Sequence, residues 1–159
     1  MATKQEIQTS VKRLMQAFTA FKPDPEDMKG FMELVHEKLS KYTAFVILKA
    51  VDEIIETDNY FPRIAEMIAH CEGVVLRERN RLHSVLVSYE SDWYWDKLHS
   101  RGEWERLAGE FERIGYTAMA ANVRERMNGY LVKMEKITSE QREQLMERVK
   151  GVREKMEAK

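Results

Sequence analysis

The chain has little of what interrupts helices or stabilises secreted folds. Of its 159 residues, seven are glycine, three are proline and one is cysteine. A single cysteine excludes an internal disulfide and suits a reducing compartment. No run of about 18 apolar residues occurs, as a membrane-spanning helix would need, and the first residues lack the apolar core of a signal peptide. We therefore expect a soluble, cytoplasmic protein.

Net charge is also nearly absent. The chain holds 26 Lys and Arg residues against 27 Asp and Glu residues, so it has no global attraction to nucleic acid or to an anionic membrane. Hydrophobic residues nevertheless make up 43% of the sequence and charged residues 33%, which is enough apolar material for a core. The abundance of Glu, Arg, Lys, Met, Leu and Ala predicts an all-α fold.

The first part of the chain shows apolar residues at helical spacing. This spacing predicts helices over residues 4–20, 25–39 and 44–57. We expect Asp24 to cap the second helix, with Pro25 in its first position, and Ser40 or Thr43 to cap the third. The expected buried face of the third helix comprises Phe45, Leu48, Val51, Ile54 and Ile55, widened by Val46 and Ile47.

The remainder of the chain predicts longer helices. Pro62 is expected to open a fourth helix, which Gly73 would loosen or end, and a helical stretch follows to about residue 100, with Val75 and Leu76 on its apolar face. Further helices are expected over residues 103–114, 117–135 and 138–156. A composition shift near residue 73 predicts a compact N-terminal helical bundle, residues 1–73, followed by a long-helical C-terminal half, residues 74–159.

Sequence motifs for catalysis are missing. No Gly-Lys-Ser/Thr phosphate loop and no dinucleotide fingerprint occurs, so we expect neither an ATP site nor another cofactor. Glu33 and His36 form a Glu-x-x-His pattern, but helical di-iron sites need a second copy, and we interpret the two residues as a surface pair. Cys71, next to His70, is expected to pack as a small hydrophobic residue. We predict neither a metal site nor enzyme activity.

The aromatic and aliphatic residues of the second half are candidates for binding a partner protein. Tryptophan is typical of the residues that dominate protein interfaces, and a thin apolar stripe under many charges suits a docking helix. The candidate partner-binding residues are Trp93, Trp95, Trp104, Leu145, Val149 and Val152. The alternative is that the tryptophans pack between helices.

Two other classes of function stay open. Arginines interspersed with aromatic residues can bind single-stranded nucleic acid through phosphate contacts and base stacking. The candidate nucleic-acid contacts are Arg77, Arg79, Arg81 and Arg101, although acidic neighbours dilute their charge. The third class is a helical homodimer that associates through the last predicted helix.

One segment resembles a known family. The helix predicted from Ala44 leads into the sequence YFPRIAEM, residues 60–67. Over residues 5–72 the chain resembles the N-terminal domain of the phage replicative-helicase loader/inhibitor family. In physical terms, the proline starts a helix and the aromatic residue before it packs on the core.

The resemblance implies a function in phage DNA replication. It implies a protein in the cytoplasm of the host cell that binds the host's replicative hexameric DNA helicase and loads or inhibits it, without an ATPase of its own. The implied partners are the helicase hexamer and an origin-binding replication protein, with contact to DNA as a further interaction.

Overall fold

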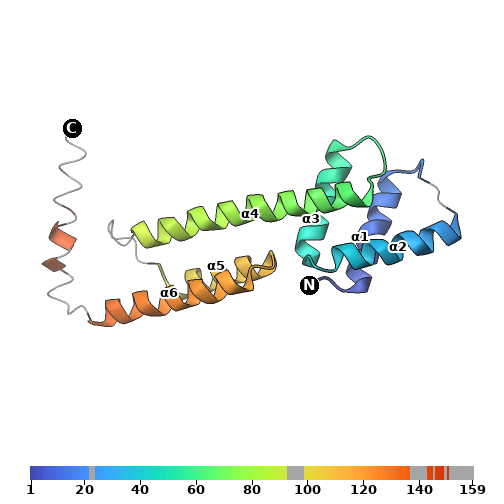
Figure 1. Cartoon of the computed structure of the whole chain (residues 1–159). Helices are drawn as coiled ribbons and strands as arrows, with labels where there is room; N and C mark the ends of the chain where they lie inside the picture. Colours follow the sequence, from blue (N-terminus) through green and yellow to red (C-terminus); the bar gives the residue numbers. More distant parts are fainter. Residues whose placement is uncertain (22–23, 93–98, 137–142, 145, 149, 151–159) are drawn as a thin grey trace, which may run out of the picture. The chain divides into compact units, whose positions relative to one another are not determined.

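The computed structural model describes residues 1–21, 24–92, 99–136, 143–144, 146–148 and 150. These residues contain helices and no strand, which confirms the predicted all-α fold (Figure 1). The helices are α1 (Lys4–Ala17), α2 (Pro25–Leu39), α3 (Ala44–Thr57), α4 (Ile64–Asp92), α5 (Arg101–Arg113) and α6 (Thr117–Lys136). Within this part of the chain, no helix has both the length and the apolar character needed to cross a membrane.

The chain divides into two compact units. Unit 1 consists of Met1–Asn80 and Arg113–Tyr116, and unit 2 consists of Arg81–Glu112 and Thr117–Lys159. The division therefore falls after Asn80, inside α4, and differs from the composition shift near residue 73. The last predicted helix, residues 138–156, lies largely outside the described residues.

Two helices of unit 1, α1 and α3, begin at N-terminal caps whose side chains accept a backbone hydrogen bond. The Thr3 hydroxyl accepts a hydrogen bond from the Glu6 backbone at 3.3 Å, and the Glu6 carboxylate accepts one from the Thr3 backbone at 2.7 Å. This reciprocal pair satisfies two otherwise unpaired N–H groups. Thr43 caps α3 as predicted. Asp24 precedes Pro25 at the start of α2, also as predicted, although the Asp24 side chain makes no capping hydrogen bond.

The start of α4 differs from the prediction by two residues. Pro62 was expected to be the first helical residue, but α4 begins at Ile64. Arg63 occupies the cap position, because its backbone N–H donates to the Glu66 carboxylate at 2.6 Å and its carbonyl accepts from the Glu66 backbone. Pro62 is buried one position earlier, where it fixes the extended approach of the chain to the helix.

An aromatic cluster packs beside this turn. Phe61, the residue before the proline, stacks on Phe21 with 3.7 Å between ring centroids. It also meets Phe18 edge-on at 6.2 Å and Phe31 at 5.8 Å. The cluster joins the chain just after α1, the middle of α2 and the turn before α4 through apolar contacts.

The long helix α4 passes through Gly73 without a break, so of the two effects expected of this residue, loosening or ending the helix, the second was wrong. Buried positions recur along α4 every three or four residues: Met67, Cys71, Val74, Glu78, Leu82, Leu86 and Tyr89. Burial of this stripe outweighs the cost of one glycine in a helix, about 1 kcal/mol. A single 29-residue helix therefore provides core residues to both units.

The buried face of α3 is rotated from the predicted one. Val46, Ile47, Val51 and Ile54 are buried as expected, together with Ala50. Leu48 is exposed, and Phe45 and Ile55 are half-buried. The reason is tertiary, because α3 packs against α1 and also pairs with α4.

Unit 2 is built from the second half of α4 together with α5 and α6. His83 contacts Phe111, whereas Tyr89 contacts Trp104, so α5 runs antiparallel to α4. Ser100 caps α5 and forms a reciprocal pair with Glu103, a signal that sequence reasoning missed. The core of the unit comprises Leu82, Leu86, Tyr89, Trp104, Leu107, Ala108, Phe111, Ala120, Val123 and Met127.

The turn between α5 and α6 belongs to unit 1. Gly115 has φ +90°, the left-handed conformation that favours glycine just beyond the end of a helix. The Thr43 hydroxyl donates a hydrogen bond to the Arg113 carbonyl at 2.6 Å. The Arg113 guanidinium lies 4.1 Å from the centre of the Phe45 ring. These contacts attach the turn to the first residues of α3.

Two glycine substitutions should have opposite effects on stability. Gly115→Ala places a side chain in the left-handed region and should lower the free energy of unfolding by about 1 kcal/mol. Gly109→Ala, inside α5 with open space around it, should raise it by about 0.5–1 kcal/mol. Urea unfolding followed by circular dichroism measures both values. Equal effects of the two substitutions would contradict the assignment of the turn.

Candidate functional site

The residues predicted to bind a partner are only partly described. Trp93, Trp95, Leu145, Val149 and Val152 lie outside the described residues. Trp104 is 1% exposed, and its ring packs against Tyr89 at 5.4 Å and Tyr130 at 5.7 Å. Trp104 is therefore a core residue of unit 2 and not a surface anchor. For Trp104, the alternative stated in the sequence analysis, that the tryptophans pack between helices, is therefore correct.

The four candidate nucleic-acid arginines do not form one basic patch. Arg77 pairs with a carboxylate of α3, and Arg81 pairs with a carboxylate of α5. Arg79 and Arg101 have no carboxylate within 4 Å in the part of the chain that the structure describes. Arg77 and Arg81 therefore have much of their charge neutralised.

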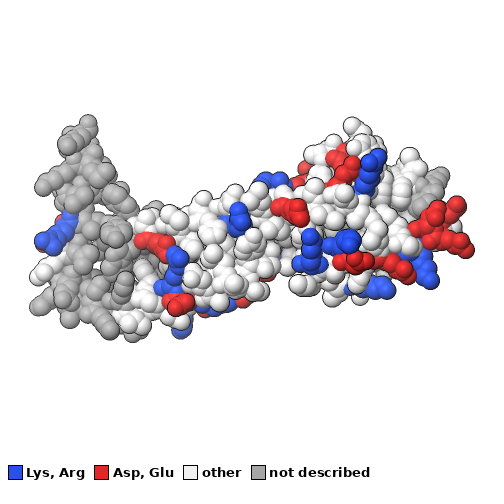
Figure 2. Space-filling model, in the orientation of Figure 1, with Lys and Arg blue, Asp and Glu red and all other residues white. Residues whose placement is uncertain are grey.

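Charges of both signs are mixed over the surface of unit 1. On the face drawn in Figure 2, lysine and arginine side chains lie among aspartate and glutamate side chains. Acidic side chains gather at the N-terminal end of α2, whose first turn contains Glu26 and Asp27. This distribution gives no broad basic surface on this face for a nucleic-acid backbone.

A shallow hollow in unit 1 brings together residues from three segments. The connection between α2 and α3, the outer face of α4 and the turn before α6 enclose about 310 Å³. The residues that line this tyrosine hollow are Lys41, Tyr42, Glu72, Val75, Leu76, Arg79 and Tyr116. Leu76 was predicted to face the core, but it is 49% exposed, because the buried stripe of α4 passes through Val74 and Glu78.

Hydrogen bonds and ion pairs fix one side of the tyrosine hollow. The Tyr42 hydroxyl donates to the Glu72 carboxylate at 3.3 Å, and the Lys41 ammonium lies 3.8 Å from the same carboxylate. Burial raises the pKa of Tyr42, and its hydrogen bond with Lys41 raises the pKa of that lysine. Tyr42 is therefore neutral and Lys41 charged at neutral pH.

The chemistry of the tyrosine hollow is that of a contact surface. Its lining residues include no serine, cysteine or histidine, and its Tyr42 hydroxyl and Lys41 ammonium are both held by the Glu72 carboxylate. It presents two tyrosines, an exposed leucine and Arg79, residue types that carry much of the binding energy at protein interfaces. Among the described residues, no three His, Cys, Asp or Glu side chains are placed to hold a metal ion.

Cys71 lies in the buried stripe of α4. Burial raises the pKa of its thiol from 9.0 to about 12. A thiol in this setting stays protonated at neutral pH and is a poor nucleophile. This agrees with the interpretation of Cys71 as a small packed side chain.

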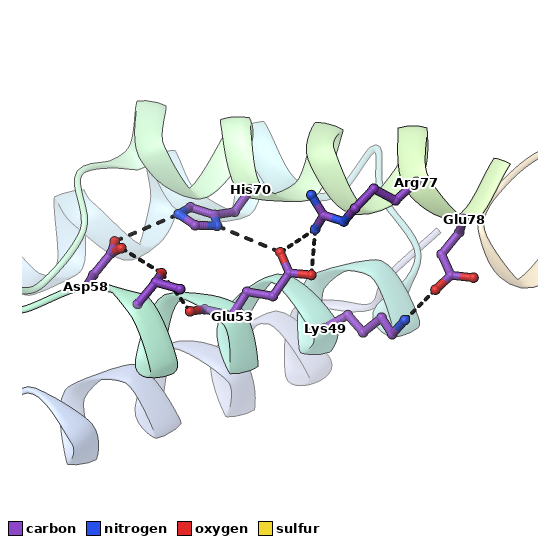
Figure 3. A network of polar contacts seen from close by, with 7 residues as sticks. Lys49, Glu53, Asp58, His70, Arg77 and Glu78 are labelled. Atoms are coloured by element: carbon purple, nitrogen blue, oxygen red, sulfur yellow. Dashed lines mark hydrogen bonds and ion pairs between the residues drawn. The ribbon is translucent and has the colours of Figure 1, made fainter. Parts of the chain in front are cut away.

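A polar network connects α3 with α4 along the surface of unit 1 (Figure 3). Glu53 receives hydrogen bonds from Arg77, and one of its carboxylate oxygens lies 4.0 Å from the His70 ring. The opposite side of that ring is 3.8 Å from the Asp58 carboxylate. His70 thus lies between two carboxylates, one from α3 and one from the residue that ends it.

The same network contains a charge inside the buried stripe. Glu78 occupies a buried position on α4, and Lys49 of α3 donates a hydrogen bond to its carboxylate. Burying a carboxylate is costly unless a partner compensates it. Sequence reasoning missed this network, although Lys49 and Glu53 lie one helical turn apart on α3, and His70, Arg77 and Glu78 follow at helical spacing on α4.

Comparison of the chain with protein-family models, with curated proteins and with solved structures finds no match. The function proposed below therefore rests on the sequence resemblance described above and on the chain's own residues and geometry. Of the described surface, the tyrosine hollow combines exposed apolar area, aromatic residues and an unpaired cation in one place.

The Lys49–Glu78 pair should contribute more to stability than an exposed pair on α2. The lysines in the Lys49–Glu78 and Lys38–Glu37 pairs are 46% and 47% exposed, but the glutamates are 10% and 65% exposed. We expect Lys49→Met to lower the free energy of unfolding by about 1–2 kcal/mol, less than the about 3–5 kcal/mol of a fully buried pair. Lys38→Met should cost below about 0.5 kcal/mol.

The double variant Lys49→Met/Glu78→Met tests the cause of this loss. Removing both charges leaves apolar side chains of similar length, which should recover most of the stability. Chemical unfolding of the unchanged protein, Lys49→Met, Lys38→Met and the double variant measures the four free energies of unfolding. A double variant that is no more stable than Lys49→Met would contradict the assignment.

The Cys71 thiol should resist alkylation while the protein is folded. Iodoacetamide at pH 8 should modify the native protein at least about 100-fold more slowly than the protein in urea, because the folded thiol is both buried and protonated. The raised pKa also means that this group's contribution to stability is lost as the pH rises from about 9 toward about 12. Mass spectrometry measures the labelling rates, and equal rates would refute the buried position.

Proposed function

We propose that this chain is a non-enzymatic replication accessory protein of a phage, which binds the replicative hexameric DNA helicase of the host cell and loads or restrains it. The observation that carries the proposal is the resemblance over residues 5–72 to the helicase loader/inhibitor family. That span coincides with α1, α2, α3 and the first turns of α4, all in unit 1. The Phe61–Pro62 step of the resemblance lies at the aromatic cluster that precedes α4.

The proposed mechanism uses binding energy alone. The sequence contains no phosphate loop, so the protein cannot drive the helicase ring by hydrolysing ATP at such a site. A protein of this kind changes the ring only if it binds one state, such as an opened ring, more tightly than another. Shifting a ring from 1% to 99% in the favoured state would require about 5.5 kcal/mol of differential affinity.

The tyrosine hollow is the proposed contact surface within the described residues. An apolar side chain of the helicase would pack on Leu76 between Tyr42 and Tyr116, and a carboxylate would pair with Arg79. Such a cluster of an aliphatic residue, tyrosines and an arginine is typical of the centre of a protein interface. Trp93, Trp95 and the stripe Leu145, Val149 and Val152 stay predicted contacts.

A pair of aspartate substitutions on α4 tests this function. Leu76→Asp puts a charge in the centre of the tyrosine hollow and should weaken binding to a purified bacterial replicative helicase hexamer by at least about 10-fold, or about 1.4 kcal/mol. Val87→Asp, at a residue that is 61% exposed on the same helix but outside the hollow, should change the affinity less than about 2-fold. Biolayer interferometry with the full chain measures both.

The outcomes separate the classes of function. Failure of the full chain to bind the helicase would overturn the proposed partner. Binding of single-stranded DNA with a steep dependence on salt would favour the nucleic-acid alternative. A mass that rises with protein concentration in sedimentation experiments would favour the homodimer. Equal losses in the two aspartate variants would show that the hollow is not the contact surface.

A further inference from the structure

A second hollow of unit 1 lies between α1 and α2. It encloses about 320 Å³, at the low end of the roughly 300–1,000 Å³ of ligand sites. Its lining residues are Lys4, Ile7, Gln8, Lys29, Met32, Glu33 and His36. Ile7 is buried and Met32 half-buried, so they form an apolar floor, and the polar residues form the rim. We call this the α1–α2 groove.

The rim residues follow the two helices. Lys4 and Gln8 lie one turn apart on α1, and Lys29, Glu33 and His36 lie at successive turns of α2. Side chains at these spacings share one face of a helix. Each helix therefore lines the apolar floor with a row of polar groups.

The lysines of this groove lack acidic partners. Neither Lys4 nor Lys29 has a carboxylate within 4 Å among the residues that the structure describes, whereas Lys41 and Lys49, on other parts of unit 1, are both paired. Glu33 is the single acidic residue of the rim. The groove thus offers two cations that no described residue neutralises, above an apolar floor.

The Glu33–His36 pair lines this groove. Within the described ranges, no third His, Cys, Asp or Glu joins these two residues in a group that could hold a metal ion. Both side chains line the groove from α2. The Glu-x-x-His pattern therefore contributes polar groups to a binding surface.

We propose that the α1–α2 groove docks an acidic amphipathic helix of a partner protein. An apolar side chain of that helix packs on Ile7 and Met32, and carboxylates on its flanks pair with Lys4 and Lys29. The unbranched Met32 side chain adapts to different apolar side chains. This is the helix-in-groove mode of recognition, in which an apolar face gives affinity and flanking charges give specificity.

Charge complementarity selects this occupant over others. A small inorganic anion would leave the apolar floor unused. A basic helix would place its cations against Lys4 and Lys29, and like charges at close range are costly. Glu33 lies on the α2 rim, so it disfavours acidic residues at that point and fixes the register of the docked helix.

A charge-swap experiment with labelled peptides tests the proposal. The acidic probe is a fluorescein-labelled helical peptide with leucines on one face and glutamates on both flanks. The basic comparison peptide is identical except that lysine replaces every glutamate. The full chain is compared with Lys4→Glu/Lys29→Glu. The control is Lys12→Glu/Arg106→Glu, which makes the same change of net charge at two exposed residues outside the groove. Fluorescence anisotropy measures affinity, and NMR chemical-shift perturbation locates the peptide.

The expected result is a reversal of preference. The full chain should bind the acidic peptide at least about 10-fold more tightly than the basic one, the groove variant should prefer the basic peptide, and the control should match the full chain. Circular dichroism checks that each variant is folded. No binding of the acidic peptide below about 1 mM, or shifts outside α1 and α2, would overturn the proposal. Self-association that the groove variant abolishes would also overturn it, because the occupant would then be a second copy.

Discussion

The buried stripe of α4 is the constraint on which the rest of the structure depends. One helix has to present core residues to unit 1 through Met67, Cys71 and Val74, and to unit 2 through Leu82 and Leu86. Close to the boundary between the units, the stripe contains Glu78. A charged residue at a buried position restricts the packing around it, because its carboxylate needs a cation. Lys49 provides that cation from α3, so this pair joins α3 to α4 within unit 1.

The same constraint determines which side of α4 is available for binding. Because the stripe runs through Val74 and Glu78, the residues between and beside them face outward. Leu76 and Arg79 lie on this outer side and meet Tyr42 and Tyr116 around the tyrosine hollow. The α1–α2 groove lies elsewhere in unit 1 and has an apolar floor with two lysines that pair with no carboxylate among the described residues. The two surfaces therefore differ in chemistry.

Sequence reasoning succeeded where local signals decide the structure. The bounds of α2 and α3 follow from Asp24, Pro25 and Thr43, whose effects act within a turn of the chain. It failed where distant residues decide. The buried side of α3 depends on contacts with α1 and α4, and the burial of Trp104 depends on Tyr130 from another helix. The tyrosine hollow could not be predicted, because its residues come from three segments that only the fold brings together.

The turn at Arg113–Tyr116 has a consequence for the order in which the protein folds. The hydrogen bond from Thr43 to Arg113 connects residues 70 positions apart in the chain, and most of what lies between them from Arg81 onward belongs to unit 2. Contacts of such long range are slow to form, because a large loop must close first. During synthesis, the N-terminal helices therefore have to wait for Tyr116 to leave the ribosome before unit 1 is complete.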